Sequence, residues 1–293
     1  MNKIIKKFKL NHKSAPYYLL LPVILVFAVF IIYPIIKSFM LSFYEFKGGE
    51  YNFVGFDNYV NLMKDDIFIK SLFNTFIYLI FQVPVMVFLS LVLAYLLDQA
   101  FLKFKAVFRV SAFLPAITSL VAYSLVFKLL LNNEYGLINF LLNLVGIDSV
   151  NWLNGPISSK VSVMLAITWR WTGYNMVIML AGLQRIPQEI YEASDIDGAS
   201  RFQKFMKITL PLMKPIILFS VITSTIGTLQ LFDESYILTE GGPDSATITV
   251  AHYLYNNGFK YIKFGYAAAI SYVLVIIIAI LSYIQFKVGE DED

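Results

Sequence analysis

Residues 186–215, IPQEIYEASDIDGASRFQKFMKITLPLMKP, form a polar stretch between two long apolar segments. Pro187 suits the start of a helix, where its missing N–H has no partner in any case. Glu189 and Glu192 place negative charge near the same helix end, which carries a partial positive charge. We therefore expect a short helix from Gln188 to Asp195, ended by a turn at Asp197 and Gly198.

A second helix is expected from about Ala199 to Lys207, because apolar and basic residues alternate there with a helical period. Pro211 and Pro215 are expected to close this unit and to begin the next apolar segment. A helix, a turn and a helix with an exposed apolar face predict a docking surface for another protein. The alternative is an amphipathic helix that lies on the membrane without a protein partner. The apolar side of the second helix is made of Phe202, Phe205 and Met206, and its charged side of Arg201, Lys204 and Lys207.

This register resembles the EAA loop of permease subunits from binding-protein-dependent ABC importers, which reads Glu-Ala-Ala, then Gly, then a hydrophobic residue and Leu-Pro. The phrases IPQEIYEA, DGASRFQKF and ITLPL are most similar to the carbohydrate branch, close to the maltose and glycerol-phosphate permeases. The chain departs from the pattern at Ser194, where a small polar residue replaces the second Ala. The matching residues are Glu192, Ala193, Asp197, Gly198, Ala199, Phe205, Ile208, Leu210, Pro211 and Pro215.

The resemblance implies a membrane subunit of a bacterial carbohydrate importer. Its expected partners are a second, similar permease, a pair of ATPase subunits and an extracytoplasmic solute-binding protein. The ATPase subunits, and not this chain, are expected to bind ATP and magnesium. In the coupling loop, Glu192 would form an ion pair with the ATPase, Gly198 would permit the turn, and Phe202, Phe205 and Met206 would supply apolar contact. Ala193, Ser194, Asp197 and Ala199 complete the expected docking set.

The composition of the chain indicates an integral membrane protein. Of its 293 residues, 58% are hydrophobic and only 15% are charged, and the mean hydropathy is +0.67, which together are typical of an integral membrane protein. A net charge of +3 is too small to indicate nucleic-acid binding. The absence of cysteine excludes disulfides and thiolate metal sites, and His12 and His252 lie in different loops, so no metal site is predicted. The phosphate-binding pattern GxxxxGK[ST] is also absent, so we expect no ATP hydrolysis and no enzyme activity in this chain.

The hydropathy pattern predicts an all-α membrane domain over residues 17–286, between a basic terminus at 1–16 and an acidic tail at 287–293. The predicted inner segments hold twice as many Lys and Arg residues as the outer ones. This bias predicts that both termini and the 186–215 loop lie on the cytoplasmic side, and the resemblance implies a bacterial cell membrane. Pro115 predicts a kink in the third span, where the nearby hydroxyl of Thr118 or Ser119 satisfies freed carbonyls. The six predicted spans are Tyr17–Ile36, Phe73–Leu97, Val107–Leu131, Val161–Leu183, Ile216–Leu238 and Phe264–Phe286.

Three external segments are predicted to carry short structure. FVGFDNYVNLM, residues 53–63, and Leu137 to Val145 each suggest a short helix at the outer surface. TEGGPDSAT, residues 239–247, interrupts the helix after the fifth span. This passage again resembles the carbohydrate permeases, which implies that Gly241, Gly242 and Pro243 face the binding protein.

Polar residues inside the spans are the candidates for a translocation pathway, because a charge in hydrocarbon costs several kcal/mol unless it faces an interior or an aqueous cavity. Arg170 lies within the fourth span, and Thr223, Gly227, Gln230 and Glu234 follow helical spacing in the fifth. Aromatic rings beside polar groups suit sugars. The alternative is that these groups join helices, with Arg170 paired to Asp233 or Glu234. The full candidate set is Trp169, Arg170, Trp171, Tyr174, Asn175, Thr223, Gln230, Asp233 and Glu234.

A rival function from a different class is an ion-coupled secondary transporter that uses Arg170 with Asp233 or Glu234 as a relay. The paired broken helices typical of such transporters are not apparent in the sequence. A third alternative, a membrane-embedded enzyme, is not supported, because the sequence contains no recognisable set of catalytic residues.

Overall fold

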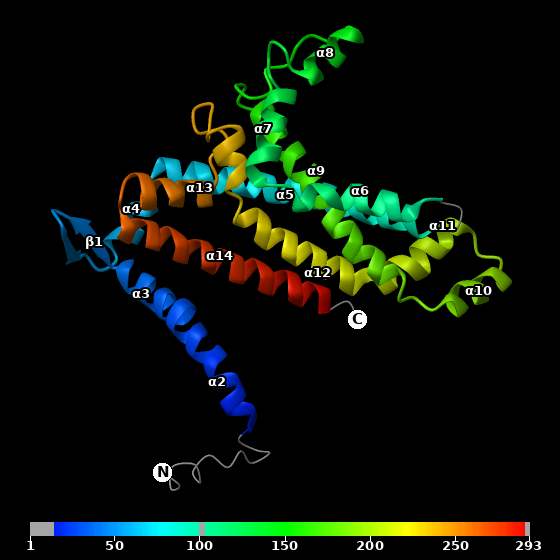
Figure 1. Ribbon diagram of the computed structural model, residues 1–293, viewed down its shortest axis with the longest axis horizontal. Helices are drawn as coiled ribbons and strands as arrows, with labels where there is room; N and C mark the ends of the chain where they lie inside the picture. Colours follow the sequence, from blue (N-terminus) through cyan, green and yellow to red (C-terminus); the bar gives the residue numbers. More distant parts are fainter. Residues whose placement is uncertain (1–14, 100–102, 291–293) are drawn as a thin grey trace, which may run out of the picture.

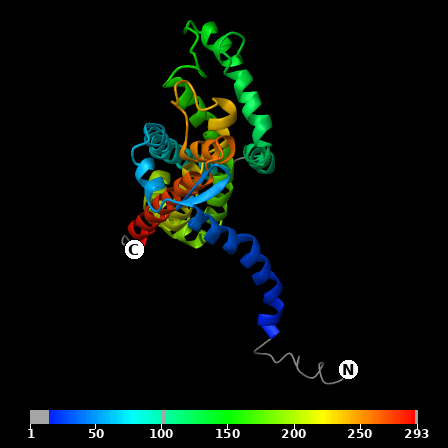
Figure 2. The ribbon, with the colours of Figure 1, turned by 90° about the vertical axis from the view of Figure 1, so that its left-hand side faces the viewer.

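The computed structural model describes residues 15–99 and 103–290. It is a bundle of long helices with two projections, the N-terminal helix and an arm formed by the third span (Figures 1 and 2). Residues 1–14 of the predicted basic terminus (1–16) and residues 291–293 of the predicted acidic tail (287–293) lie outside the described residues. In chain order, the long helical elements are α2 (Ala15–Phe27), η1 (Ala28–Ile32), α3 (Tyr33–Leu41), α5 (Asp66–Asp98), α6 (Lys105–Ile117), α7 (Leu120–Leu130), α9 (Ser158–Leu183), α12 (Leu210–Leu229) and α14 (Phe264–Glu290).

Each predicted span contains a helix, but only the first, second, fourth and sixth are covered by one continuous helical run. Four continuous helical runs are long and apolar enough to cross a membrane, and the bent pair α6 and α7 makes a fifth. The fourth predicted span, α9, has 26 residues and is long enough to cross a bilayer. Its buried Arg170, Thr172 and Asn175 make it less apolar than the others. The four continuous runs are Ala15–Leu41, Asp66–Asp98, Arg201–Leu229 and Phe264–Gly289.

The packed centre of the bundle lies between α5, α9 and α12. Val83 and Val87 of α5 meet Met176 and Met179 of α9, and Met213 of α12 completes this cluster. Two close approaches of α9 depend on glycine. A Cβ at Gly173 would lie 1.7 Å from the Ala112 carbonyl oxygen of α6, and one at Gly182 would crowd Ile216 and Met213 of α12.

The third span is not the single kinked helix that the sequence predicts. It consists of α6 and α7, whose axes differ by 99°, and α7 carries the arm away from the bundle (Figure 1). The helix ends two residues after Pro115, and Thr118 and Ser119 adopt extended backbone angles. The expected hydroxyl contact is present, because Thr118 Oγ1 donates to the Pro115 carbonyl at 2.6 Å.

The fifth predicted span has the wrong bounds at both ends. α11 (Arg201–Lys204), η2 (Phe205–Thr209) and α12 form one continuous run of 29 residues, so the second helix of the 186–215 loop and the fifth span are the same rod. The π turn of η2 precedes Pro211, which lies at the start of α12, so the missing N–H of this proline does not end the helix. The rod ends at Leu229, and Glu234 begins a separate turn, η3 (Glu234–Leu238).

The face that the sequence predicts to be external adds one feature that an all-α prediction misses. β1 (Tyr44–Lys47) and β2 (Glu50–Phe53) form an antiparallel hairpin, turned by Gly48 and Gly49, which both have positive φ. Both external helices predicted from the sequence are present, as α4 (Asp57–Leu62) and α8 (Leu137–Leu144). α13 (Val250–Tyr255) and η4 (Asn256–Lys260) complete this face.

Candidate functional site

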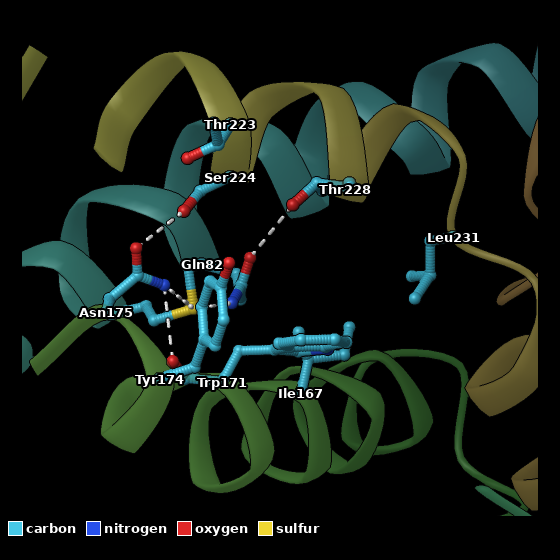
Figure 3. Close-up of a pocket in the computed structure, with 11 residues that line it drawn as sticks. Gln82, Ile167, Trp171, Tyr174, Asn175, Thr223, Ser224, Thr228 and Leu231 are labelled. Carbon is cyan, nitrogen blue, oxygen red and sulfur yellow. Dashed lines mark hydrogen bonds between the residues drawn. The ribbon is translucent and has the colours of Figure 1, made fainter. Parts of the chain in front are cut away.

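A cavity of about 250 Å³ opens between α5, α9 and α12 near the centre of the bundle (Figure 3). Its position follows from the helices that build it, because α9 contributes one wall, α12 the opposite wall and α5 the floor. Gly227 leaves open space on the α12 side, since nothing lies within 4 Å of the place a Cβ would occupy. The lining residues are Gln82, Met86, Ile167, Trp171, Tyr174, Asn175, Thr223, Ser224, Gly227, Thr228 and Leu231.

The cavity combines side-chain amides and hydroxyls on one side. Thr228 Oγ1 donates to Gln82 Oε1 at 3.3 Å, and Ser224 Oγ approaches Asn175 Oδ1 at 3.4 Å. The Asn175 amide donates to the Trp171 carbonyl at 3.2 Å. These bonds are long or bent back to the backbone, so the amides keep capacity for further hydrogen bonds from a polar guest.

Aromatic rings form the other side. Trp171 and Tyr174 meet edge to face, with ring centroids 5.8 Å apart, and Figure 3 shows both rings beside the amides of Gln82 and Asn175. Tyr174 is 41% exposed, so part of its ring faces open space. Rings next to hydrogen-bonding groups match a molecule that has apolar C–H faces and polar edges.

Of the candidate residues chosen from the sequence, Trp171, Tyr174, Asn175 and Thr223 line this cavity. Trp169 does not. It lies half exposed against Tyr123 and Phe127 of α7, with centroids 6.3 Å and 5.4 Å away. Gln230 is also outside the cavity, since it is the exposed residue that ends α12.

Arg170 is 5% exposed and lies behind the cavity, not in its lining. Its Nη2 donates to the carbonyls of Thr118 at 3.1 Å and Ala116 at 3.4 Å. The ion pairs within the described part of the chain do not include Arg170, so the predicted pairing with Asp233 or Glu234 is absent from this conformation.

The two carboxylates near Arg170 differ from each other. Glu234 is 2% exposed and accepts a hydrogen bond from the Tyr123 hydroxyl of α7. Asp233 is half-buried and precedes it in the chain. Glu234 therefore joins η3 to α7, which is the helix-joining role that the sequence left open as an alternative.

The 186–215 loop folds as a helix, a turn and a helix, as expected. α10 (Gln188–Ile196) ends before Gly198, whose φ of +73° is a conformation that favours glycine. Ser200 begins α11 with a reciprocal capping box to Gln203. Tyr191 and Thr209 share a hydrogen bond of 2.8 Å, and Lys204 pairs with Asp195, so the two helices are held against each other.

The side chains of this loop divide into internal and exposed sets. Ser194 is buried and donates to the Tyr191 carbonyl at 2.7 Å. Phe205 packs edge to face on Tyr95 of α5, with centroids 4.9 Å apart, so it joins the loop to the bundle and is not part of a free surface. Ala199 is half-buried. The exposed side chains are Glu192, Ala193, Asp197, Ile196 (89% exposed), Phe202 (73%) and Met206 (44%).

The Gly-Gly-Pro segment, which the sequence predicts to be external, is held at several points. Lys128 of α7 bonds Glu240 at 2.8 Å and lowers the pKa of that carboxyl. The Gly241 backbone lies close to the His252 ring, and His252 Nδ1 shares a hydrogen bond of 2.8 Å with Ser235. Pro243 follows a cis peptide bond. A pocket of about 310 Å³ lies beside Gly241 and Gly242.

Sequence reasoning missed the α5 contribution to the cavity. Gln82 and Met86 lie in the second span, and Gln82 is a polar residue at mid-span that the rule applied to Arg170 would have selected. Ser224 and Thr228 were also missed. They lie one residue from the Thr223 and Gly227 positions that were chosen, on the part of α12 that faces α5 and α9.

Comparisons with known proteins agree with this arrangement. The model of the family described as "binding-protein-dependent transport system inner membrane component" matches residues 63–287. The chain is 45% identical to the lactose transport system permease protein LacF of Rhizobium radiobacter, over 92% of each chain. It is 39% identical to the arabinooligosaccharides transport system permease protein AraP of Bacillus subtilis, over 95% of this chain and 90% of the relative.

A third relative and a solved structure extend the comparison. The trehalose/maltose transport system permease protein MalF of Thermococcus litoralis is 34% identical over 98% of both chains. A chain from the crystal structure of a bacterial ABC transporter involved in the import of alginate superimposes with a TM-score of 0.82 over 99% of both chains, at 23% identity. The chain, a multi-pass membrane protein, therefore belongs to the family of inner membrane permease components of binding-protein-dependent transport systems, with the fold of an ABC importer permease.

Proposed function

We propose that this chain is the membrane subunit through which an ATP-driven importer passes a carbohydrate delivered by an extracytoplasmic binding protein. The observation that carries the proposal is the cavity between α5, α9 and α12, where the Trp171 and Tyr174 rings face the amides of Gln82 and Asn175. Sugar C–H faces stack on rings, and sugar hydroxyls both donate to and accept from amides.

The substrate class we propose is a short oligosaccharide or glycoside. The relatives with the highest identities quoted above carry the names of lactose, arabinooligosaccharides and trehalose/maltose permeases. A cavity of about 250 Å³ lies just below the roughly 300–1,000 Å³ of common ligand pockets. It would therefore hold one sugar unit at a time, and a longer chain would extend beyond it.

The exposed side of the 186–215 loop is proposed to dock into an ATPase subunit. Ile196, Phe202 and Met206 supply an apolar surface, and Glu192 adds an exposed carboxylate for an ion pair. Phe205, which the resemblance implied for docking, is reassigned to packing on Tyr95. The ATPase subunits supply ATP and magnesium, and this chain contributes the mechanical connection.

The remaining assembly is proposed on the same basis. A second, similar permease would complete the pathway, both termini would lie in the cytoplasm, and the segment with Gly241, Gly242 and Pro243 would face the binding protein. That segment lies close to α13, since the Gly241 backbone approaches the His252 ring, and α13, η4, β1 and β2 would form the outer surface.

The test begins with the composition of the complex. The tagged chain is extracted gently from its native membrane, and the proteins that accompany it are identified by mass spectrometry. Recovery of a second six-span permease and an ATPase supports the proposal. A homo-oligomer without an ATPase overturns it in favour of ion-coupled transport.

The substrate is then tested in proteoliposomes that contain the purified complex and its binding protein. Uptake of a labelled disaccharide should require ATP and persist when the proton gradient is dissipated. The matched pair Asn175→Leu and Ser149→Ala separates the cavity from the external arm, since only the former should reduce uptake. Uptake that follows the proton gradient and ignores ATP would contradict the proposal.

A further inference from the structure

The contacts of Arg170 indicate a structural role that is separate from sugar binding and from proton transfer. A guanidinium in a membrane span is costly unless its donors are satisfied. Among the described residues, Arg170 has no carboxylate within ion-pair distance, although Asp233 and Glu234 are near enough to interact with its charge. Its Nε and Nη1 have no hydrogen-bond partner there either. The group is therefore held by the contacts of Nη2 and by aromatic rings.

The carbonyls that Nη2 meets belong to the end of α6. A helix leaves its last carbonyls without intrahelical partners, and its C-terminal end carries a partial negative charge. Arg170 places a cation at this end from the neighbouring helix α9, at 3.1 Å from the Thr118 oxygen and 3.4 Å from that of Ala116. These carbonyls lie at the 99° bend between α6 and α7.

Two rings hold the same guanidinium. Its central carbon lies 4.5 Å from the centroid of Tyr123 of α7 and 5.4 Å from that of Trp171. Tyr123 also donates to Glu234, which ties η3 to the far side of the bend. Contact of one guanidinium with two rings suits arginine and is poorly reproduced by lysine.

Trp171 connects this cluster to the cavity. Trp171 lines the cavity, whereas Arg170 does not, so the guanidinium approaches the indole from outside the space that a guest would fill. A change in the α6–α7 bend would thus be transmitted to the indole of Trp171, which faces the guest, by the side chain of Arg170 alone.

We propose that Arg170 is the positioning residue that fixes the α6–α7 bend and, through its contact with Trp171, the shape of the cavity wall. It caps α6, stacks on Tyr123 of α7 and supports the indole of Trp171. The transport measurement below rests on the proposed function, whereas the distance measurement does not. A failure of this proposal can therefore be distinguished from a failure of the proposed function.

The distance test uses the absence of cysteine from the chain. Spin labels are placed on exposed positions of the two helices, with Val110→Cys on α6 and Leu129→Cys on α7, in the full transporter complex. Pulsed electron paramagnetic resonance then gives the distribution of distances between the two labels. The parent should give one narrow distribution, and both Arg170→Gln and Arg170→Lys should broaden it, because neither can cap two carbonyls and stack on two rings.

Lys128→Gln is the matched control, since it removes a cation from α7 and the bond to Glu240 without touching the bend. Its distribution should stay narrow. Tyr123→Phe keeps the ring and loses the bond to Glu234, and should broaden the distribution less than Tyr123→Leu. These Tyr123 variants also give a graded result if an Arg170 variant fails to fold.

The transport readout separates positioning from a purely structural role. Arg170→Lys should raise the KM for the sugar by about tenfold, the size of one lost cation–π or stacking contact, with a smaller change in the maximal rate. A narrow, unchanged distance distribution in both Arg170 variants would overturn the proposal. Full rescue of the KM by Lys would do so as well, because it would show that charge alone is needed.

Discussion

The first and fourth spans show opposite relations between hydropathy and burial. The run Ala15–Leu41 has a mean window hydropathy of 3.0, and none of that window is buried. α9 is less apolar than the first span, and yet it packs against α5, α6 and α12 and supplies much of the core. In a bilayer the most apolar helix is the one suited to lipid, whereas a helix with polar side chains needs protein around it.

The largest effect should come from Gly173, where α9 passes α6. A Cβ there would lie 1.7 Å from the Ala112 carbonyl oxygen, and backbone cannot yield to it. We expect Gly173→Leu to abolish recovery of folded protein, measured as the monodisperse fraction on size exclusion. Gly227→Ala, which enters open space, is the control and should leave recovery unchanged. Normal recovery of Gly173→Leu would show that α9 is packed more loosely than described.

A truncation in each span should sharpen the contrast. Met176 is completely buried and Leu25 is 55% exposed. Met176→Ala should lower the free energy of unfolding by about 2–5 kcal/mol, whereas Leu25→Ala should change it by less than about 0.5 kcal/mol. Thermal unfolding of the isolated chain in detergent measures both. A large loss for Leu25→Ala that appears only in the assembled transporter would identify the first span as a subunit interface.

Substitution of the two tryptophans that flank Arg170 should distinguish the side of α9 that lines the cavity from the side that faces α7. Trp171→Ala should raise the KM for uptake by about tenfold, because one ring contact is worth roughly 0.5–1.5 kcal/mol beyond its buried area. Trp169→Ala, on the side facing α7, should change the KM by less than about twofold. Initial uptake rates in proteoliposomes decide between them. Equal effects would mean that the guest reaches beyond the cavity.

A pH-dependent effect on stability is expected at His252, a buried polar residue outside the spans. Burial, together with the charge of Lys260, lowers the pKa of His252 from 6.5 to about 4. The unfolded state therefore takes up a proton near pH 6.5 and the folded state only near pH 4. The free energy of unfolding should be highest above pH 6.5 and fall by up to about 1.4 kcal/mol per pH unit down to about pH 4.

Limited proteolysis of the 239–249 segment against pH measures this effect. His252→Gln serves as the control, since it cannot take up the proton and should show a flatter profile over the same range. Identical profiles for the two proteins would assign the pH dependence to other groups.

The 186–215 loop was predictable because its rules are local. Proline at the helix start, glycine at positive φ and a Ser–Gln capping box act within a few residues. The fusion of α11 with α12 was not, since it depends on a π turn at Phe205–Thr209 that moves Pro211 to a tolerated position. The place of the bend after Pro115 was predictable, but its angle depends on Arg170 and Tyr123, which lie 55 and eight positions away in the chain.

The site was predicted in part for the same reason. Trp171, Tyr174 and Asn175 follow from the polarity of one helix, whereas Gln82 and Thr228 become neighbours only when α5 packs on α12. Gln230 and Glu234 were assigned to the α12 stripe on the assumption of a continuous helix, which ends at Leu229. A period computed along one segment cannot indicate where that segment ends.

The continuous rod from Arg201 to Leu229 sets how movement at one end of the molecule reaches the other. Phe202 and Gly227 are separated by about 38 Å at 1.5 Å per residue, with no loop between them. A tilt of about 10° about the Gly227 end would move Phe202 by about 6–7 Å. A displacement of several ångströms at the 186–215 loop would therefore require only a small tilt at the end of the rod where Thr223 and Gly227 line the cavity.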